Sequence, residues 1–172
     1  MNYATIKYND VSNGPGIRTS LFVSGCTHHC EGCFNSIAWD FNYGEPYTKK
    51  VEDEIIDSLR YSYVKGITLL GGEPFEPQNQ GPLVELTDRI RRELPDKTIW
   101  CFSGYTIEEM TDGKLSRYET TMRLLKNIDV LVDGKFVLEL KNLMLKFKGS
   151  SNQRTIMVKE TLEKKEIVLW NE

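Results

Sequence analysis

Three cysteines lie within eight residues of the chain, Cys26, Cys30 and Cys33, in the spacing C-x3-C-x2-C. Thiolates are soft ligands that suit zinc or iron–sulfur clusters, and proteins hold iron–sulfur clusters through cysteine thiolates. No fourth cysteine lies near this loop, so a four-iron cluster would keep one iron with an open coordination position. An open position distinguishes a catalytic metal site from a closed structural one. We therefore predict a [4Fe-4S] cluster that binds a further ligand.

The alternative for the same loop is a structural zinc site. Three cysteines and one histidine form many such sites, and His28 or His29 could be the fourth ligand. A zinc site requires none of the other motifs in this chain, which favours the cluster. His28 could equally form only a local hydrogen bond. Cys101 lies in an apolar segment, where free cysteine behaves as a small buried hydrophobe, so we predict that it packs in the core.

A glycine-rich motif, Gly71-Gly72-Glu73-Pro74, follows the apolar run at 66–70. Glycine permits close approach of the backbone to a ligand, and a carboxylate is the simplest partner for an ammonium group. In isolation the motif would be a turn at the end of a strand. Together with the cysteine loop, it predicts that the two glycines and Glu73 bind the ammonium group of a cofactor.

The hydrophobic pattern predicts the elements that position these groups. Apolar runs predict strands at 17–23, 66–70, 98–102 and 128–132, with further strand candidates at 6–8, 143–147 and 155–158. Helices are predicted from Thr48 to about Ser62, from Pro82 to Leu94, after Thr106 and at 119–126. The run 167–170 is predicted as an edge strand or a partner-facing segment. Alternating strands and helices indicate an α/β fold with a mostly parallel sheet.

The candidate site residues all follow predicted strands. In barrel-like sheets the catalytic groups lie on loops at the carboxyl ends of the strands, and a closed barrel of eight units needs about 200–250 residues. A chain of 172 residues is too short for that closure. We therefore predict a partial, open β/α barrel, whose open side leaves room for a macromolecular substrate.

Composition limits the function classes. The chain has 40% hydrophobic and 27% charged residues, which is ordinary for a globular protein, so we predict one domain over 1–172. A net charge of −3 without a basic run argues against binding nucleic acid. No signal peptide or membrane span is evident, and four cysteines with three clustered do not resemble a disulfide framework. These features predict a cytoplasmic protein that does not contact membranes.

The cysteine loop resembles that of the radical S-adenosylmethionine (SAM) enzymes. The longer run from Phe22 to Asn35, with Gly32 before the third cysteine, resembles more narrowly the activating proteins of anaerobic (class III) ribonucleotide reductases. Four further motifs fit that family in the same order, so that the match spans 13–154. They are Asn13-Gly-Pro-Gly-Ile-Arg18, Gly71-Gly-Glu-Pro74, Val132-Asp-Gly-Lys-Phe136 and Gly149-Ser-Ser-Asn-Gln-Arg154.

The resemblance implies the role of each motif. The three cysteines would hold the cluster, and SAM would bind the open iron through its amino and carboxylate groups. Gly71, Gly72 and Glu73 would meet the SAM ammonium, and Gly32 and Phe34 would shape the adenine side of the pocket. Further candidates follow, each with an alternative. Ser103 and Asp133 could contact the ribose or carboxylate, or cap a helix or turn; Lys135 and Arg154 could meet the SAM carboxylate or a partner; Arg18 would be one functional arginine in a turn.

The resemblance also implies the reaction. An electron from the cluster would cleave SAM, and the resulting 5′-deoxyadenosyl radical would remove a hydrogen atom from a glycine of the large subunit of the anaerobic reductase. A low-potential electron donor such as flavodoxin or ferredoxin would be a second partner. Two alternatives remain. The first is a small radical SAM enzyme that acts on a metabolite, and the second is a zinc-binding interaction module without catalysis.

Overall fold

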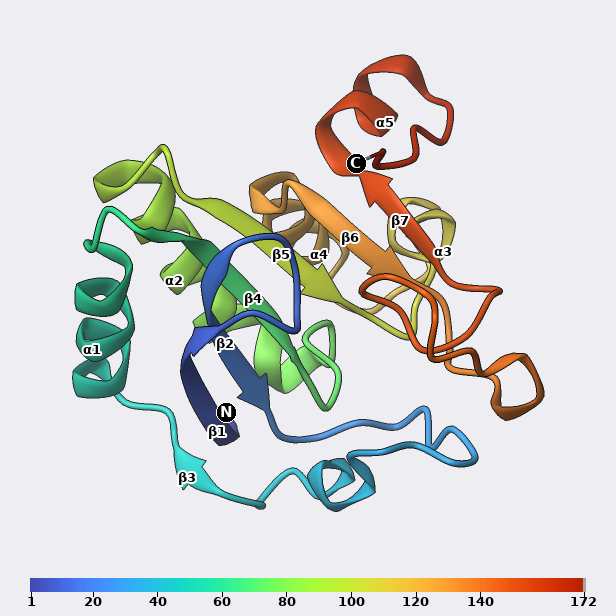
Figure 1. Ribbon diagram of the computed structural model, residues 1–172, viewed down its shortest axis with the longest axis horizontal. Coiled ribbons are helices and arrows are strands. Elements are labelled where there is room, and N and C mark those ends of the chain that lie inside the picture. Colours follow the sequence, from blue (N-terminus) through green and yellow to red (C-terminus); the bar gives the residue numbers. More distant parts are fainter. Residues whose placement is uncertain (172) are drawn as a thin grey trace.

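The computed structural model describes residues 1–171, and within them one seven-stranded sheet has the order β3-β1-β2-β4-β5-β6-β7 (Figure 1). The four central strands run parallel, while β1, β3 and β7 are antiparallel to their neighbours. The sheet is open and mostly parallel, as predicted. The strands are β1 (Asn2–Asp10), β2 (Ile17–Val23), β3 (Glu45–Pro46), β4 (Val64–Gly71), β5 (Thr98–Phe102), β6 (Val130–Asp133) and β7 (Arg154–Met157).

The main core lies between the sheet and the helices that cover one of its faces, the far face in Figure 1. Inward side chains of the strands, such as Leu21, Leu69 and Leu131, meet the apolar stripes of these helices. The helices are α1 (Lys49–Leu59), α2 (Pro77–Glu93), α3 (Ile107–Thr111), α4 (Tyr118–Asn127) and α5 (Val158–Lys164), with 3-10 turns η1 (Ser36–Trp39) and η2 (Leu138–Leu140). Within residues 1–171, no helix is long and apolar enough to cross a bilayer.

Local sequence signals explain where most helices begin. Thr48 caps α1 by accepting a hydrogen bond from the backbone N–H of Val51, and Thr106 forms a capping box with Glu109 at α3. Both caps confirm the sequence prediction. The predicted start of the next helix at Pro82 is wrong, because α2 already begins at Pro77 and Pro82 lies inside it. Pro77 also fits a first helical position, where the missing N–H has no partner to lose.

The C-terminal third differs from the prediction. Residues 143–147 form an exposed turn instead of a strand, whereas 154–157 form β7, and the helix α5 was not predicted. The run 167–170 pairs with β7, because Met157 N–H donates to Val168 O at 2.8 Å and Trp170 N–H to Thr155 O at 2.8 Å. Strands from both ends of the chain thus join one sheet, which is consistent with a single domain.

Aromatic residues cover the helix-free face of the sheet over β5, β6 and β7. Trp100 packs there edge-on against Phe147 and Trp170, with ring centroids 5.5 and 5.1 Å apart. Arg18 stacks beside Trp100, and its guanidinium donates only to neutral oxygens, among them Thr68 Oγ1 at 2.8 Å and Ile67 O at 2.7 Å. Burial lowers the Arg18 pKa to about 10. These contacts favour a structural role for Arg18, at the sheet edge opposite the cysteine loop.

Candidate active site

The cysteine loop continues directly from β2 at the carboxyl edge of the sheet. Its first residues pair with the turn η1, since Gly25 N–H donates to Ala38 O at 2.8 Å and Cys26 N–H to Trp39 O at 3.2 Å. Gly25 has a φ of +94°, and a Cβ there would lie 2.2 Å from the Phe41 ring, so only glycine fits. The loop is thereby fixed at both ends.

The three loop cysteines have free thiols of unequal exposure. Cys26 is buried, whereas Cys30 and Cys33 are half-buried. Burial raises the pKa of the Cys26 thiol to about 11, although the backbone N–H of His28 opposes this and the Glu73 carboxylate adds to it. Iron would have to displace the proton of this thiol, because a cysteine ligand must be deprotonated. In the described part of the chain, no three His, Cys, Asp or Glu side chains converge on one metal ion.

Glu73 lies at the centre of a hydrogen-bond network that joins three strand ends. Its carboxylate is 1% exposed and accepts four hydrogen bonds, two at each oxygen. Oε1 accepts from Ser103 Oγ at 2.8 Å and from the Phe75 backbone N–H at 2.9 Å. Oε2 accepts from the Gly104 N–H at 2.7 Å and lies 2.9 Å from His28 Nε2. Within residues 1–171, no lysine or arginine pairs with this carboxylate.

His28 connects the cysteine loop to this network. Its ring packs edge-on against Tyr105, with centroids 4.4 Å apart, and a Cβ at Gly104 would lie 2.4 Å from His28 Cδ2. His29 instead stacks on Trp39 at a centroid distance of 4.5 Å. Both histidine rings thus have partners other than a metal, which argues against either one as a fourth zinc ligand.

Gly71 and Gly72 place the Glu73 motif against the start of the cysteine loop. Gly72 N–H donates to Val23 O at 2.7 Å, and Glu73 N–H to Gly25 O at 2.8 Å. A Cβ at Gly71 would lie 2.7 Å from Val23 O, and one at Gly72 would lie 2.5 Å from Gly25 O. The backbone approach that we predicted for a ligand is thus already required for contact between the two motifs.

Two residues of the site were missed by the sequence analysis. Glu76 Oε1 accepts from both the backbone N–H and the hydroxyl of Thr27, at 2.7 and 2.6 Å, so a second buried carboxylate holds the cysteine loop. Asn79 of α2 donates to Ser24 O at 3.0 Å and to Glu73 O at 2.9 Å. The available signal was the spacing of Glu73, Glu76 and Asn79, three residues apart at a helix start.

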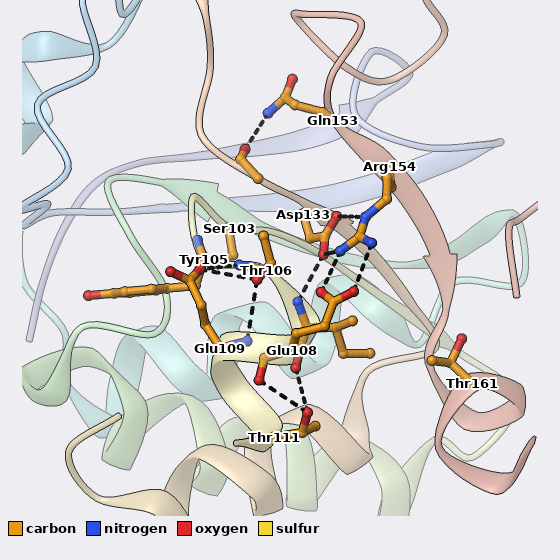
Figure 2. Close-up of polar contacts among 12 residues, drawn as sticks. Ser103, Tyr105, Thr106, Glu108, Glu109, Thr111, Asp133, Gln153, Arg154 and Thr161 are labelled. Carbon is orange, nitrogen blue, oxygen red and sulfur yellow. Dashed lines mark hydrogen bonds and ion pairs between the residues drawn. The ribbon is translucent and has the colours of Figure 1, made fainter. Parts of the chain in front are cut away.

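Asp133, at the end of β6, has a different set of partners (Figure 2). Arg154 donates to both of its carboxylate oxygens, from Nε at 3.0 Å and from Nη2 at 2.6 Å. The Ile107 N–H at the start of α3 donates to Oδ2 at 2.9 Å. Arg154 also pairs with Glu108 at 2.7 Å, which lowers the pKa of that carboxyl. These contacts favour the helix-start alternative for Asp133 and a structural partner for Arg154.

The remaining predicted residues lie near the cysteine loop, except Cys101, which lies in the core. Gly32 has a φ of +71°, and a Cβ there would lie 2.8 Å from Leu138 Cδ1. Phe34 is 89% exposed, so its ring is free to stack on a ligand. Lys135 is also exposed. Cys101 is fully buried in the core, which raises its pKa and confirms the prediction that it packs there.

The donor set fits a cluster with a polar ligand beside it. Three free thiols lie on one fixed loop, and no described disulfide engages them. Polar side-chain atoms near this loop are buried without a hydrogen-bond partner in residues 1–171, namely Ser24 Oγ, Asn35 Nδ2 and Asn79 Oδ1. Buried polar groups are normally satisfied. Their concentration here indicates a site that a ligand completes.

Known proteins share this arrangement. The family described as "4Fe-4S single cluster domain" matches residues 12–156. The anaerobic ribonucleoside-triphosphate reductase-activating protein of Escherichia coli K12 is 46% identical over 155 residues, covering 89% of this chain and 96% of that protein. The chain belongs to this family of activating proteins. Its members with the same name in Vibrio cholerae and Enterobacteria phage T4 are 44% and 39% identical, covering 89% and 90% of this chain and 96% and 92% of theirs.

Membership in this activating-protein family decides between the hypotheses for the cysteine loop. The loop is that of a radical SAM protein with a 4Fe-4S cluster, and the zinc-binding module is excluded. The fold agrees, because its four central parallel strands place the loop and the Glu73 motif at one edge.

Proposed function

We propose that this chain activates an anaerobic ribonucleotide reductase by generating a glycyl radical on it. The single observation that supports this most directly is the cysteine loop fixed against the Glu73 motif in a chain of the activating-protein family. Cys26, Cys30 and Cys33 would hold the [4Fe-4S] cluster. When bound, the cluster supplies the electron that cleaves SAM to methionine and a 5′-deoxyadenosyl radical.

In this proposal, the residues of the Glu73 motif bind and orient SAM. Glu73 has no arginine or lysine partner, so its negative charge remains available to favour the ammonium and sulfonium groups of SAM. Four hydrogen bonds keep its carboxylate in one orientation, and such preorganisation is what an electrostatic site requires. Gly71 and Gly72 would present backbone groups to the SAM ammonium, as predicted.

The other pocket residues stay predictions. Phe34 and Gly32 would border the adenine, since the exposed Phe34 ring lies one residue beyond Cys33. Ser103 would act through Glu73, to which its hydroxyl donates. Asp133 is predicted as a SAM contact, but its pairing with Arg154 supports the structural alternative. Lys135 is exposed beside this edge and would meet SAM or the reductase.

The reductase is the partner that the family name implies, and a low-potential donor such as flavodoxin or ferredoxin would supply electrons. With these partners, the reaction would take place in the cytoplasm. The test is anaerobic reconstitution with iron, sulfide, SAM and a reductant, with and without a glycyl-radical reductase. A doublet in electron paramagnetic resonance that requires the reductase would support the proposal. Production of 5′-deoxyadenosine without any reductase radical would contradict it and favour a metabolite substrate.

A further inference from the structure

Residues 134–153, here called the ledge, project from the sheet edge that holds the cysteine loop. The ledge leaves the sheet at the end of β6 and returns as β7, which runs antiparallel to β6, so both its ends lie at this edge. Figure 1 shows the ledge beside the loop that follows β2. Contact between them is close, because a Cβ at Gly32 would lie 2.8 Å from Leu138 Cδ1.

The ledge has an ordered internal framework. Ser151 N–H donates to Leu140 O at 2.9 Å, and Asn142 N–H to Gly149 O at 3.2 Å, so its two arms pair like a short hairpin. Gln153 Oε1 accepts from Gly149 N–H at 2.8 Å, while its Nε2 donates to Gly134 O at 2.9 Å (Figure 2). Residues 149–153, the polar part of the last family motif, therefore build the base of the ledge.

Large apolar side chains project from this framework into solvent. Leu143 and Met144 at the tip are 87% and 89% exposed, and Leu138 and Leu140 are exposed nearer the cysteine loop. Ile37, in the turn after the loop, is 60% exposed. Exposed apolar side chains that gather beside a functional site mark interaction surfaces. Neighbouring Phe147 is instead anchored against Trp100, so the ledge is held at its far side.

We propose that the ledge, with Ile37 of the turn after the cysteine loop, is the docking surface for the glycine-bearing segment of the reductase. This inference rests on the proposed function. The glycine must reach SAM beside the cysteine loop, so the protein that holds the glycine must cover this edge. A metabolite would be enclosed by the pocket and would leave the tip residues Leu143 and Met144 in water. The segment that fits is an extended backbone with apolar side chains on either side of the glycine.

The positive charge of the ledge indicates which charged side chains the reductase segment would carry. Four lysines and one glutamate lie between 134 and 153 in a chain whose net charge is −3. Lys135 and Lys141 are both exposed on the first arm of the ledge. An acidic group next to the apolar part of the reductase segment would therefore be favoured, chiefly through the rate of association.

The test replaces the tip side chains in the full chain. The double variant Leu143→Asp/Met144→Asp is compared with Val11→Asp, whose side chain is 66% exposed in the loop before β2, at the opposite sheet edge. We expect the double variant to cleave SAM with a chemical reductant as the wild type does. Its dissociation constant for the reductase should rise at least about tenfold, because docking would then bury two carboxylates in an apolar contact. The glycyl radical yield should fall at low reductase concentration, and Val11→Asp should change neither quantity.

The outcomes separate the two proposals. Unchanged reductase affinity and radical yield in the double variant would overturn the docking surface while the wild type still supports the activase. An equal loss in Val11→Asp, or loss of SAM cleavage in the double variant, would also overturn it, because the effect would then not belong to docking. A wild type that cleaves SAM but forms no radical on the reductase would overturn the proposed function and this inference together.

Discussion

Two carboxylates, Glu73 and Asp133, follow parallel strands of the same sheet, and both are 1% exposed. Asp133 is bound by the Nε–Nη2 edge of the Arg154 guanidinium and by the start of α3. Glu73 is bound by a hydroxyl, two backbone N–H groups and His28, and by no described lysine or arginine. The charge of Asp133 is neutralised by Arg154 inside the fold, whereas the Glu73 carboxylate is held in one orientation without a cationic partner among the described residues.

The difference shows how one sheet edge can serve two purposes. A buried ion pair such as Asp133–Arg154 fixes the position of neighbouring elements, in this case β6, β7 and α3. A buried carboxylate held by neutral donors is suited to a cationic ligand. We therefore expect substitutions around Glu73 to lower the rate of SAM cleavage, and substitutions around Asp133 to lower the free energy of unfolding.

The largest expected effect comes from the cysteines that adjoin Glu73. Cys26→Ala, Cys30→Ala and Cys33→Ala should each abolish SAM cleavage, since each removes one of only three thiolates for the cluster. Bound iron and sulfide and 5′-deoxyadenosine are measured after anaerobic reconstitution. Cys101→Ala is the matched control and should keep its iron, because Cys101 lies in the core. Full 5′-deoxyadenosine production by any loop variant would refute its assignment as a ligand.

Glu73→Gln should lower the rate of SAM cleavage about 10- to 100-fold. A glutamine has one accepting oxygen, so part of the four-donor network loses its acceptor, and hydrogen bonds to charged groups are worth about 1.5–3 kcal/mol. The rate of 5′-deoxyadenosine formation is measured per bound cluster, so that loss of iron is not mistaken for loss of catalysis. A normal rate would mean that the charge of Glu73 plays no part in binding SAM.

Asp133→Asn should lower the free energy of unfolding by about 1–3 kcal/mol, as expected when a buried partner of a charged group is lost. SAM cleavage per folded, cluster-loaded protein should stay unchanged. Chemical denaturation and the SAM assay are performed on the same preparation. If instead the rate falls as far as in Glu73→Gln while stability is kept, Asp133 contacts SAM and the contrast between the two carboxylates fails.

The smallest effect is expected for Glu108, the exposed second partner of Arg154. Its hydrogen bond with Arg154 lowers the pKa of Glu108 below its ordinary value of 4.5. Ionised Glu108 therefore adds stability above that ordinary value and loses it as the pH falls through the lower folded-state pKa. Because the side chain is largely exposed and screened, the contribution should be at most about 1 kcal/mol.

Unfolding of the wild type and Glu108→Gln is compared at about pH 7 and about pH 3. The wild type should be the more stable protein at the higher pH, and the difference should shrink at the lower pH. A difference that is independent of pH would show that the ion pair with Arg154 does not contribute through its charge.

Local signals in the sequence were sufficient to predict several strands and helix starts. The apolar runs at 17–23 and 98–102 are β2 and β5 with the predicted bounds, and both Thr caps lie where the spacing indicated. The start of α2 was not recoverable in the same way. Pro77 and Pro82 both resemble first helical residues, and only the side-chain contacts of Asn79 and Gln80 to the preceding turn decide between them.

The partners of the site residues were beyond prediction for a different reason. Glu73 was predicted as a site residue from its motif, but its donors come from residues 28, 75, 103 and 104, and pairing between distant loops has no local pattern. The same holds for Arg154, whose partner Asp133 lies 21 residues earlier. Residues 143–147 of the ledge were mistaken for a strand, because this apolar run forms a turn in which Leu143 and Met144 face solvent and Phe147 packs against Trp100.

The packing of Arg18, Trp100, Phe147 and Trp170 covers part of the sheet's helix-free face. Under the docking proposal, the reductase covers the sheet edge at which SAM would bind. A shared edge imposes an order on the binding of SAM, the binding of the reductase and the release of products. SAM would have to load before the reductase arrives, and methionine and 5′-deoxyadenosine would have to wait for its departure. Excess reductase should therefore slow turnover of SAM, which product-release kinetics can detect.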